Sequence, residues 1–375
     1  MKTFILNICL VFFVALGFTQ ENVRELGLLP EAIFETSGLI FYNNKIVTHN
    51  DSGNTAQLFE LDTTSLQITR TITISNAVNI DWEDIAQDDT YIYVGEIGNN
   101  NGGRQDLAVY RILKTDYDTS NSVEAEKIEF SYADQTDFIL SPNSDWDAEA
   151  LFVLNDQLVI LTKQWQSNGT VAYGIPKIPG TYIASKIGEY AINGLVTGAS
   201  FNPDTQVLYL IGYSKFLLPF IVRADNLLAN NIFSGTVEKK ELNLGFLQAE
   251  GITFINENHY LISSEKFTNN SPMITSESRL FSFDTSDEFI EEPLPTENKQ
   301  GLLIYKRFGA RELEYEIQGE ILGRAIFDTQ GRRIKYILGK DIRENTVNLA
   351  TLNSAIYYLT FYTDKGTISA PFWMN

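Results

Sequence analysis

A hairpin pattern occurs five times between Glu35 and Lys266, and this repetition limits the folds that the chain can adopt. Each copy has a small or acidic residue, an apolar strand, a polar turn, a second apolar strand and a final polar or charged residue. In the second copy the first strand follows Glu83 and the second strand ends at Glu96. Antiparallel strands joined by a short turn place the start of one beside the end of the other. We therefore expect these two carboxylates at one rim of a small sheet.

The spacing of the copies predicts how the hairpins are arranged. Comparable rim residues are Glu35, Glu83, Glu149, Thr197 and Glu250, between 48 and 66 residues apart. A period near 50 with three or four short strands per unit is typical of a β-propeller. A β-sandwich also has many short strands, but it would not repeat an acidic residue at one place in its hairpins. We predict an all-β chain with a five-bladed propeller over residues 20–285.

Six blades are the alternative. The additional strands would lie in the 66-residue interval between Glu83 and Glu149, or the N-terminal sequence VRELGLL (23–29) would complete a blade.

The remaining segments differ from the repeats in composition. Residues 1–19 combine Lys2 with an apolar run and small residues near Thr19, which predicts a secretory signal. Residues 286–301 are acidic and contain proline, which indicates a linker, and residues 302–375 have the strand pattern of a small β-sandwich. Cys9 is the single cysteine and lies in the signal, so we expect no disulfide or thiol chemistry after cleavage. We also expect no transmembrane segment after cleavage, because no later apolar run is long enough.

Charge and motifs exclude several functions. The net charge of −20 argues against nucleic acid and anionic membranes as partners, because both bind clustered Lys and Arg. The chain has no Gly-X-Ser-X-Gly elbow and no P-loop or dinucleotide glycine pattern.

Acidic residues that face one channel repel each other unless a cation or lysines lie between them. A first interpretation is therefore a divalent cation, most simply calcium, which takes carboxylate and amide oxygens in irregular geometry. The predicted ligands are Asp51, Glu83, Glu96, Glu149 and Glu250.

Two other interpretations of the rim remain open. The rim could bind a polar ligand such as a glycan, with Trp82, Trp146, Trp165 and Tyr213 as stacking surfaces. The residues predicted to contact that ligand are Asn50, Asp84, Lys163, Tyr213, Lys215, Glu265 and Lys266. Alternatively, the carboxylates only accept hydrogen bonds from backbone N–H groups at exposed turns.

A calcium-dependent hydrolase of esters, lactones or phosphoesters is the enzymatic alternative. Its candidate catalytic residue is His49, which lies beside Asn50 and Asp51 and could carry a proton. The simpler interpretation of His49 is a turn residue bonded to the backbone.

Short motifs carry a resemblance for residues 23–285. They are SGL (37–39), WEDIA (82–86) followed by YVGEIGNN, DAEAL (147–151), and AEGI (249–252) followed by SSEK. They resemble SdiA-regulated-type propellers and, more distantly, gluconolactonase- and phytase-like secreted propellers. The latter resemblance implies calcium on the channel face. Thr197 replaces the rim acid, however, and Lys163 and Lys215 stand at return positions, where they could neutralise carboxylates without a metal.

The C-terminal region carries a second resemblance. Its sequences GRAIFDTQGRRI (323–334) and NTVNLATLNSAIYYLTFYTDKGT (345–367) are similar to the C-terminal sorting domain of type IX secretion cargo from Bacteroidetes. The usual Pro-Asn-Pro opening is absent, and Ser354–Ala355 stand where glycine is usual. The resemblance implies the type IX secretion machinery as a partner. Together these features predict a secreted or outer-membrane-surface propeller that binds a divalent cation, a polar ligand or both.

Overall fold

The computed structural model describes residues 22–270, 273–289, 302–306, 311–317 and 319–374. The predicted signal, residues 1–19, lies outside them, as do residues 290–301 of the predicted linker. Strands dominate the described residues, with short helical turns at η1 (Glu31–Ile33), α1 (Lys114–Thr119) and η2 (Gly339–Asp341). Among the described residues no helix is long and apolar enough to cross a membrane. The prediction of an all-β fold is confirmed.

Five antiparallel units of four strands make up the larger part of the molecule. The first contains β2 (Thr36–Tyr42), β3 (Lys45–Asn50), β4 (Gln57–Asp62) and β5 (Ile68–Ile74). The second contains β6 (Trp82–Gln87), β7 (Tyr91–Glu96), β8 (Ala108–Leu113) and β10 (Glu126–Tyr132). The third contains β11 (Ala148–Leu154), β12 (Gln157–Thr162), β13 (Thr170–Pro176) and β14 (Gly180–Tyr190). The fourth contains β15 (Leu195–Asn202), β16 (Val207–Tyr213), β17 (Pro219–Ala224) and β18 (Val237–Glu241).

The fifth unit joins the two ends of this region. It contains β19 (Ala249–Phe254), β20 (His259–Ser264), β23 (Arg279–Asp284) and β1 (Asn22–Leu28), in which Val23 pairs with Phe283. The sequence VRELGLL is therefore the outer strand of this unit. The long interval before Glu149 contains α1, the short strand β9 (Ser122–Val123) and a loop over residues 133–147. β9 extends the first unit, and β10 and β14 pair in parallel across the second and third units.

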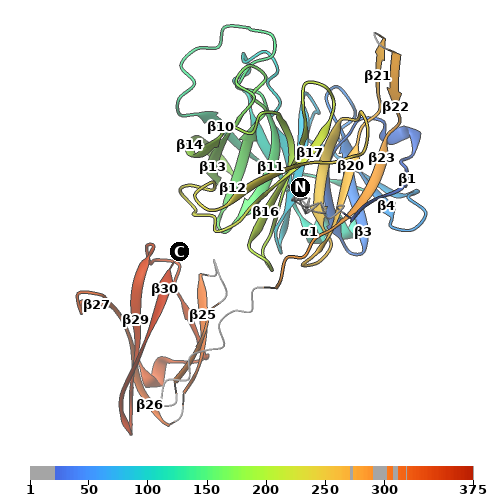
Figure 1. Ribbon diagram of the computed structural model, residues 1–375. Coiled ribbons are helices and arrows are strands. Elements are labelled where there is room, and N and C mark those ends of the chain that lie inside the picture. The colour runs from blue at the N-terminus through green and yellow to red at the C-terminus, as the bar shows by residue number, and fades with distance from the viewer. Residues whose placement is uncertain (1–21, 271–272, 290–301, 307–310, 318, 375) are drawn as a thin grey trace, which may run out of the picture.

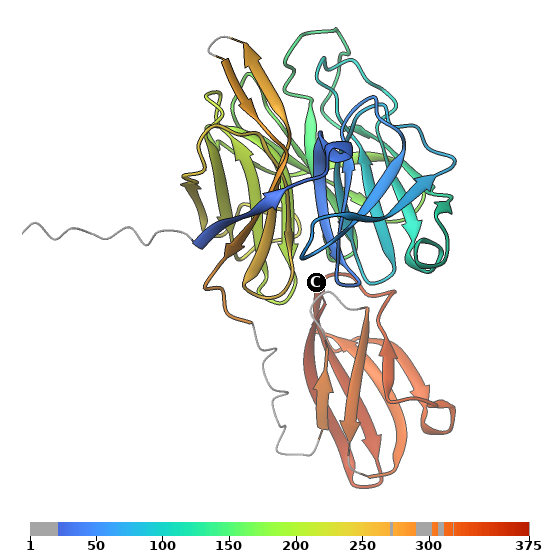
Figure 2. The ribbon, with the colours of Figure 1, turned by 90° about the vertical axis from the view of Figure 1, so that its right-hand side faces the viewer.

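The five units form a propeller. Their first strands contact one another in the cyclic order β2, β6, β11, β15, β19 and back to β2. A separate apolar cluster fills the space between each neighbouring pair, including the last and the first. Figures 1 and 2 show these sheets arranged around a common centre. Because both faces of each inner strand are covered, nearly every residue in these strands is buried.

Tight turns between the first two strands follow the sequence signals. Asn43 and Asn44 have φ values of 49° and 57°, and Asn155 has 56°. Asparagine tolerates this left-handed conformation better than most residues, so these positions favour hairpin turns. The turns lie on the face of the propeller opposite the predicted rim.

The C-terminal region forms a small β-sandwich with its own core. One sheet contains β24 (Leu302–Tyr305), β25 (Glu312–Ile317) and β28 (Thr346–Asn348). The other contains β27 (Arg333–Leu338), β26 (Ile321–Asp328), β29 (Ala355–Thr363) and β30 (Gly366–Met374). Leu313, Tyr315 and Phe361 are among the side chains that pack between them. The sandwich lies on the side of the propeller away from the hairpin of β21 (Phe267–Asn270) and β22 (Met273–Ser276) (Figures 1 and 2).

Candidate functional site

A β-bulge near the start of every inner strand builds the rim of the channel. The bulges leave the following residues out of the pairing: Ser37 and Gly38, Glu83 and Asp84, Glu149, Thr197, and Glu250. Bulges re-aim side chains and often lie next to functional sites. In the first unit this register gives Ser37, rather than Glu35, the place of Glu83. Glu35 instead corresponds to Asp81, two residues before the bulge.

Asp84 occupies the channel floor and ties three inner strands together. Its Oδ1 accepts a hydrogen bond from the Ile85 N–H at 2.8 Å. Its Oδ2 accepts from the N–H groups of Leu151 at 2.8 Å and Ala199 at 3.4 Å. A Cβ at Gly38 would overlap this carboxylate, so the neighbouring strand needs glycine there. Burial raises the pKa of Asp84, and the three N–H donors oppose that rise. Asp84 was predicted to contact a ligand, but the structure gives it these backbone partners.

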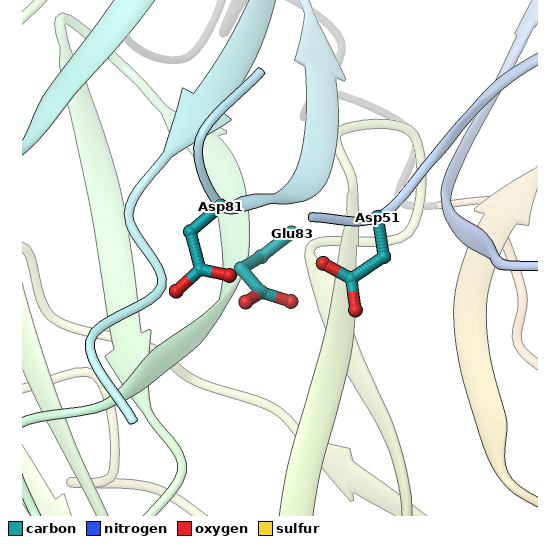
Figure 3. A group of neighbouring side chains, drawn as sticks. All are labelled: Asp51, Asp81 and Glu83. Atoms are coloured by element: carbon teal, nitrogen blue, oxygen red, sulfur yellow. The ribbon is translucent and has the colours of Figure 1, made fainter. Parts of the chain in front are cut away.

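Five carboxylates gather directly above this floor in two groups that share Glu83. One group is Asp51, Asp81 and Glu83, which Figure 3 shows pointing toward one another, and the other is Glu83, Asp147 and Glu149. Within each group the carboxylate oxygens lie within 4.8 Å of one another. Of the predicted metal ligands, the structure brings together Asp51, Glu83 and Glu149.

Asp81 and Asp147 are the members of these groups that sequence reasoning missed. Each lies two residues before a rim glutamate, so that the pattern Asp-X-Glu occurs at Asp81–Glu83 and again at Asp147–Glu149. This repeated pair was the available signal.

Glu83 has surroundings that disfavour a charged carboxylate. It is 2% exposed, and no donor among the described residues hydrogen-bonds to its carboxylate. Burial and the charges of neighbouring carboxylates, Asp51 first, raise its pKa well above the usual range. Burial is also the main cause that raises the pKa of Asp51 to about 6 and that of Asp81 to about 7. The site therefore resists full ionisation unless a positive charge enters it.

Lys163 brings a positive charge to the second group. Its Nζ lies 2.8 Å from Oε1 of Glu149, and both side chains are buried. Burial lowers the pKa of Lys163, but the neighbouring acidic groups, Glu149 first among them, together outweigh burial and hold that pKa above its ordinary value. Asp147 accepts hydrogen bonds from the Asn99 N–H at 2.7 Å and the Trp165 Nε1 at 2.8 Å. The negative charge of the second group is thus partly compensated. Among the described residues, no lysine or arginine forms an ion pair with the first group.

Glu96 positions the loop that carries Asp81. Its carboxylate accepts hydrogen bonds from the N–H groups of Ile80 and Asp81, each at 2.9 Å, and forms a 2.7 Å ion pair with Arg104. The structure places this predicted ligand outside both carboxylate groups.

Glu250 and Glu265 lie on the fifth unit, outside the two groups. Burial raises the pKa of Glu250, and it raises the pKa of Glu265 to about 8. The Gln248 side chain donates a hydrogen bond to Glu265.

Asn50 and His49 have structural partners. The Asn50 side chain donates to the Ala32 carbonyl at 2.8 Å, and the Asn79 side chain donates to the carbonyl of Asp51 at 2.8 Å. His49 is fully buried in β3 against Trp82, with its Nδ1 3.0 Å from the Asn50 carbonyl oxygen. Burial lowers the pKa of His49 to about 4, so the ring is neutral at pH 7. The ring has no contact with solvent through which to carry a proton.

The remaining predicted ligand-binding residues divide between two places. Tyr213 and Lys215 line a cavity beside the mouth. Lys266 forms a 3.0 Å ion pair with Glu277 at the base of the β21–β22 hairpin.

The tryptophans also divide. Trp82 is fully buried and Trp146 stacks on Tyr132, whereas Trp165 lines the same cavity as Tyr213 and Lys215. Among these three tryptophans, Trp165 is therefore the one that faces a cavity.

Comparisons with known proteins find likeness in shape alone. No family model matches the chain, and no curated protein matches it. One solved structure is PorZ of the Porphyromonas gingivalis type IX secretion system, 11% identical with a TM-score of 0.34. The match covers 90% of this chain and 44% of PorZ, so the chain spans less than half the length of PorZ.

Two further solved structures are similarly distant. The exo-β-1,3-galactanase 1,3Gal43A of Clostridium thermocellum is 11% identical with a TM-score of 0.46, covering 92% of this chain and 82% of that one. The β-propeller domain of Myceliophteria thermophila Cps50 (Swd1) is 8% identical with a TM-score of 0.35, covering 71% and 100%. None of these likenesses is close enough to identify a shared function. The resemblance to SdiA-regulated, lactonase-like and phytase-like propellers stays a prediction beyond the fold itself.

Proposed function

We propose that this protein is a β-propeller binding module that holds a calcium ion at its channel mouth and binds a polar ligand beside it. The observation that carries the proposal is Glu83, a buried carboxylate without a hydrogen-bond donor among the described residues, shared by two carboxylate groups. An isolated buried anion is strongly unfavourable unless it is paired or coordinates a metal. A cation among Asp51, Asp81 and Glu83 removes that penalty.

The donor set suits a hard cation. All the converging atoms are carboxylate oxygens, and calcium accepts six to eight oxygens, including carbonyls and water, in flexible geometry. Gly98 leaves space there, because a Cβ at this position would overlap the carboxylates of Glu83 and Asp81. Softer metals prefer imidazole and thiolate ligands. The first carboxylate group is the preferred site, since Lys163 already compensates Glu149 in the second.

Elemental analysis of the purified protein, followed by melting curves with and without a chelator, tests the proposal. We expect bound calcium, and we expect the melting temperature to fall when calcium is removed, because a ligand that binds only the folded state stabilises it. Absence of metal together with an unchanged melting temperature would remove the calcium site. Chelator-sensitive turnover in a panel of esters, lactones and phosphoesters would instead favour the hydrolase alternative, for which His49 offers no accessible proton carrier.

The proposal includes export to the cell surface or medium. It is supported by the signal pattern in residues 1–19 and by the resemblance of residues 302–375 to type IX sorting domains. The C-terminal region has its own core, as a separately recognised module requires. A reporter fused to residues 302–375 should reach the surface of a type IX-competent host and stay inside a secretion-deficient one.

A further inference from the structure

A cavity of about 420 Å³ opens beside the carboxylate groups and is lined by residues from the third, fourth and fifth units. Its volume lies within the roughly 300–1,000 Å³ of typical small-molecule sites. One contact joins it to the second carboxylate group, because Trp165 donates to Asp147. Gln248, which also lines the cavity, donates to Glu265, outside both groups. Tyr213 also lines it, with its ring centroid 5.4 Å from Nζ of Lys163.

Trp165 gives this cavity an aromatic wall of fixed orientation. Its Nε1–H is bonded to Asp147 at 2.8 Å, and Nζ of Lys163 lies 4.7 Å from the ring centroid. The indole is only partly buried, so part of its surface remains available to the cavity. A flat, amphipathic ring held in this way offers a stacking surface to another ring.

Lys215 gives the cavity a positive charge. It is exposed and forms no ion pair or hydrogen bond among the described residues, in a chain whose net charge is −20. Other lysines of the propeller do have acidic partners, such as Lys177 with Asp88 and Lys266 with Glu277. Its ammonium group therefore offers a charge partner to a ligand that carries an anion.

Neutral hydrogen-bonding groups complete the lining. The Nε2 of Gln248 donates to Glu265 and to Tyr213, and its Oε1 receives no hydrogen bond from the part of the chain that the structure describes. The side-chain amide of Asn143 likewise has no hydrogen-bond partner there, and both residues line the cavity. Such amide groups match the donors and acceptors of neighbouring hydroxyls.

We propose that this cavity binds a hexuronate residue, a pyranose ring that carries a carboxylate. The ring stacks on Trp165, the carboxylate pairs with Lys215, and the hydroxyls meet Gln248 and Asn143. The assignment rests on the proposed function in taking the channel mouth as the binding face. It depends on the cavity rather than on the calcium ion.

The test compares methyl β-D-glucuronide with methyl β-D-glucoside by calorimetry and tryptophan fluorescence on the full chain. The two probes share a ring and differ in the carboxylate. We expect the glucuronide to bind with a Kd on the order of 1 mM, as suits a small ligand, and the glucoside about tenfold more weakly. Lys215→Ala should lower glucuronide affinity about tenfold and leave glucoside affinity unchanged, because it removes one charge-assisted hydrogen bond. Lys127→Ala, on strand β10 and away from the cavity, is the matched control and should change neither.

A second pair of variants separates stacking from the Trp165–Asp147 hydrogen bond. Trp165→Phe loses the N–H but keeps an aromatic face, whereas Trp165→Leu loses both. If Trp165→Phe retains glucuronide binding and Trp165→Leu loses it, the sugar ring stacks on the aromatic face of residue 165. Equal affinity for the two sugars, no binding of either, or unchanged binding in Trp165→Leu would overturn the assignment.

Running each titration in calcium and in chelator separates the two proposals. Glucuronide binding by a protein that takes up no calcium removes the cation site and supports the cavity. Calcium binding without glucuronide binding removes the hexuronate assignment and supports the cation site. If an acetylated glutamate peptide binds the cavity and the glucuronide does not, the assignment of a hexuronate as the ligand is also wrong.

Discussion

At the scale of single residues, Glu83 has the surroundings that most favour a bound cation. It is 2% exposed and belongs to both carboxylate groups. Burial disfavours the charged form of a carboxyl group, and neighbouring negative charges disfavour it further. Without a cation its charged form is disfavoured, because burial and the neighbouring carboxylates raise its pKa, and with a cation its charge is compensated. Calcium and protons therefore compete for this residue.

Replacing Glu83 with glutamine tests that competition in the metal-free protein. Glu83→Gln removes a group that repels its neighbours, so we expect the melting temperature of the chelator-treated variant to equal or exceed that of the wild type by a few degrees. The calcium-dependent rise should shrink in parallel. Differential scanning calorimetry measures both effects.

Glu238→Gln, on the exposed strand β18, is the matched control for this substitution. It should change neither melting temperature. A large loss of metal-free stability in Glu83→Gln would contradict repulsion between Glu83 and the neighbouring carboxylates.

The dependence of stability on pH follows from the same groups. The pKa values of Asp81 and Glu265 are raised to about 7 and about 8 in the folded protein, above their unfolded values. The folded state then binds more protons than the unfolded state, so stability falls as pH rises through this range. His49 contributes the opposite slope only below its unfolded pKa of about 6.5.

We therefore expect the melting temperature in chelator to fall between about pH 6.5 and pH 8.5. Calcium should reduce the part of this slope that comes from Asp81, because the bound ion replaces the proton of that carboxyl group. A flat or rising profile in chelator over the same window would show that these carboxyl groups are not held protonated.

The residues of the site were partly predictable from the sequence. The repeat placed Asp51, Glu83 and Glu149 at one rim because strand pairing is local and its geometry is regular. The repeat did not place Asp81 and Asp147, because alignment on the rim residue ignored the position two residues earlier. Glu96 was predicted as a ligand, and its ion pair with Arg104 depends on the path of an irregular loop that no strand pattern specifies.

At the scale of secondary-structure elements, the bulge near the start of each inner strand sets the geometry of the channel. The bulge of β6 directs the Asp84 side chain toward the channel axis. There its carboxylate accepts hydrogen bonds from the N–H groups of Ile85 in β6, Leu151 in β11 and Ala199 in β15. These hydrogen bonds fix the distances between strands β6, β11 and β15 on the channel side. The carboxylate groups above them thus depend on a floor that is itself built by hydrogen bonds.

Asp84→Ala tests whether the hydrogen bonds to the Asp84 carboxylate stabilise the channel floor. It leaves three buried N–H groups without an acceptor, so we expect the free energy of unfolding to fall by about 3–5 kcal/mol. The loss should appear in chelator as well as in calcium, because the role is structural. Chemical denaturation measures it, with Asp89→Ala on an exposed turn as the control. A loss below about 1 kcal/mol would show that the floor does not depend on Asp84.

The sequence pattern predicts the hairpins well. It predicts less well how the two ends of the propeller sequence pair to close the ring of units. Neighbouring strands are joined by short turns, so their pairing follows from local patterns such as Asn43–Asn44. β1 pairs with β23 from the opposite end of the propeller sequence, and no short-range pattern specifies that partner.

At the scale of the whole molecule, the propeller and the C-terminal sandwich have separate apolar cores. An ion pair between Arg311 and Asp156, at 2.7 Å, joins the two regions on the face opposite the channel mouth. Both side chains are more than two-fifths exposed, and such pairs contribute about 0–1 kcal/mol. The sandwich therefore leaves the mouth open to ligands.

Truncation after Phe289, which keeps the contacts of Asp287 with Tyr209 and Arg223 of the propeller, tests this independence. Because the cores are separate, we expect the full chain to show two calorimetric transitions and the truncated chain to lose one. The transition of the propeller should move by no more than about 2 °C. A propeller that fails to fold without the sandwich would show that the two regions form one cooperative unit.

Calcium titration of the metal-free full chain by isothermal calorimetry measures whether the channel mouth holds a cation. We expect saturable binding that Glu83→Gln weakens at least about tenfold, since it removes one charged ligand, and that Glu238→Gln leaves unchanged. No heat of binding at millimolar calcium, or equal affinity in the Glu83→Gln protein, would contradict a cation site at the channel mouth.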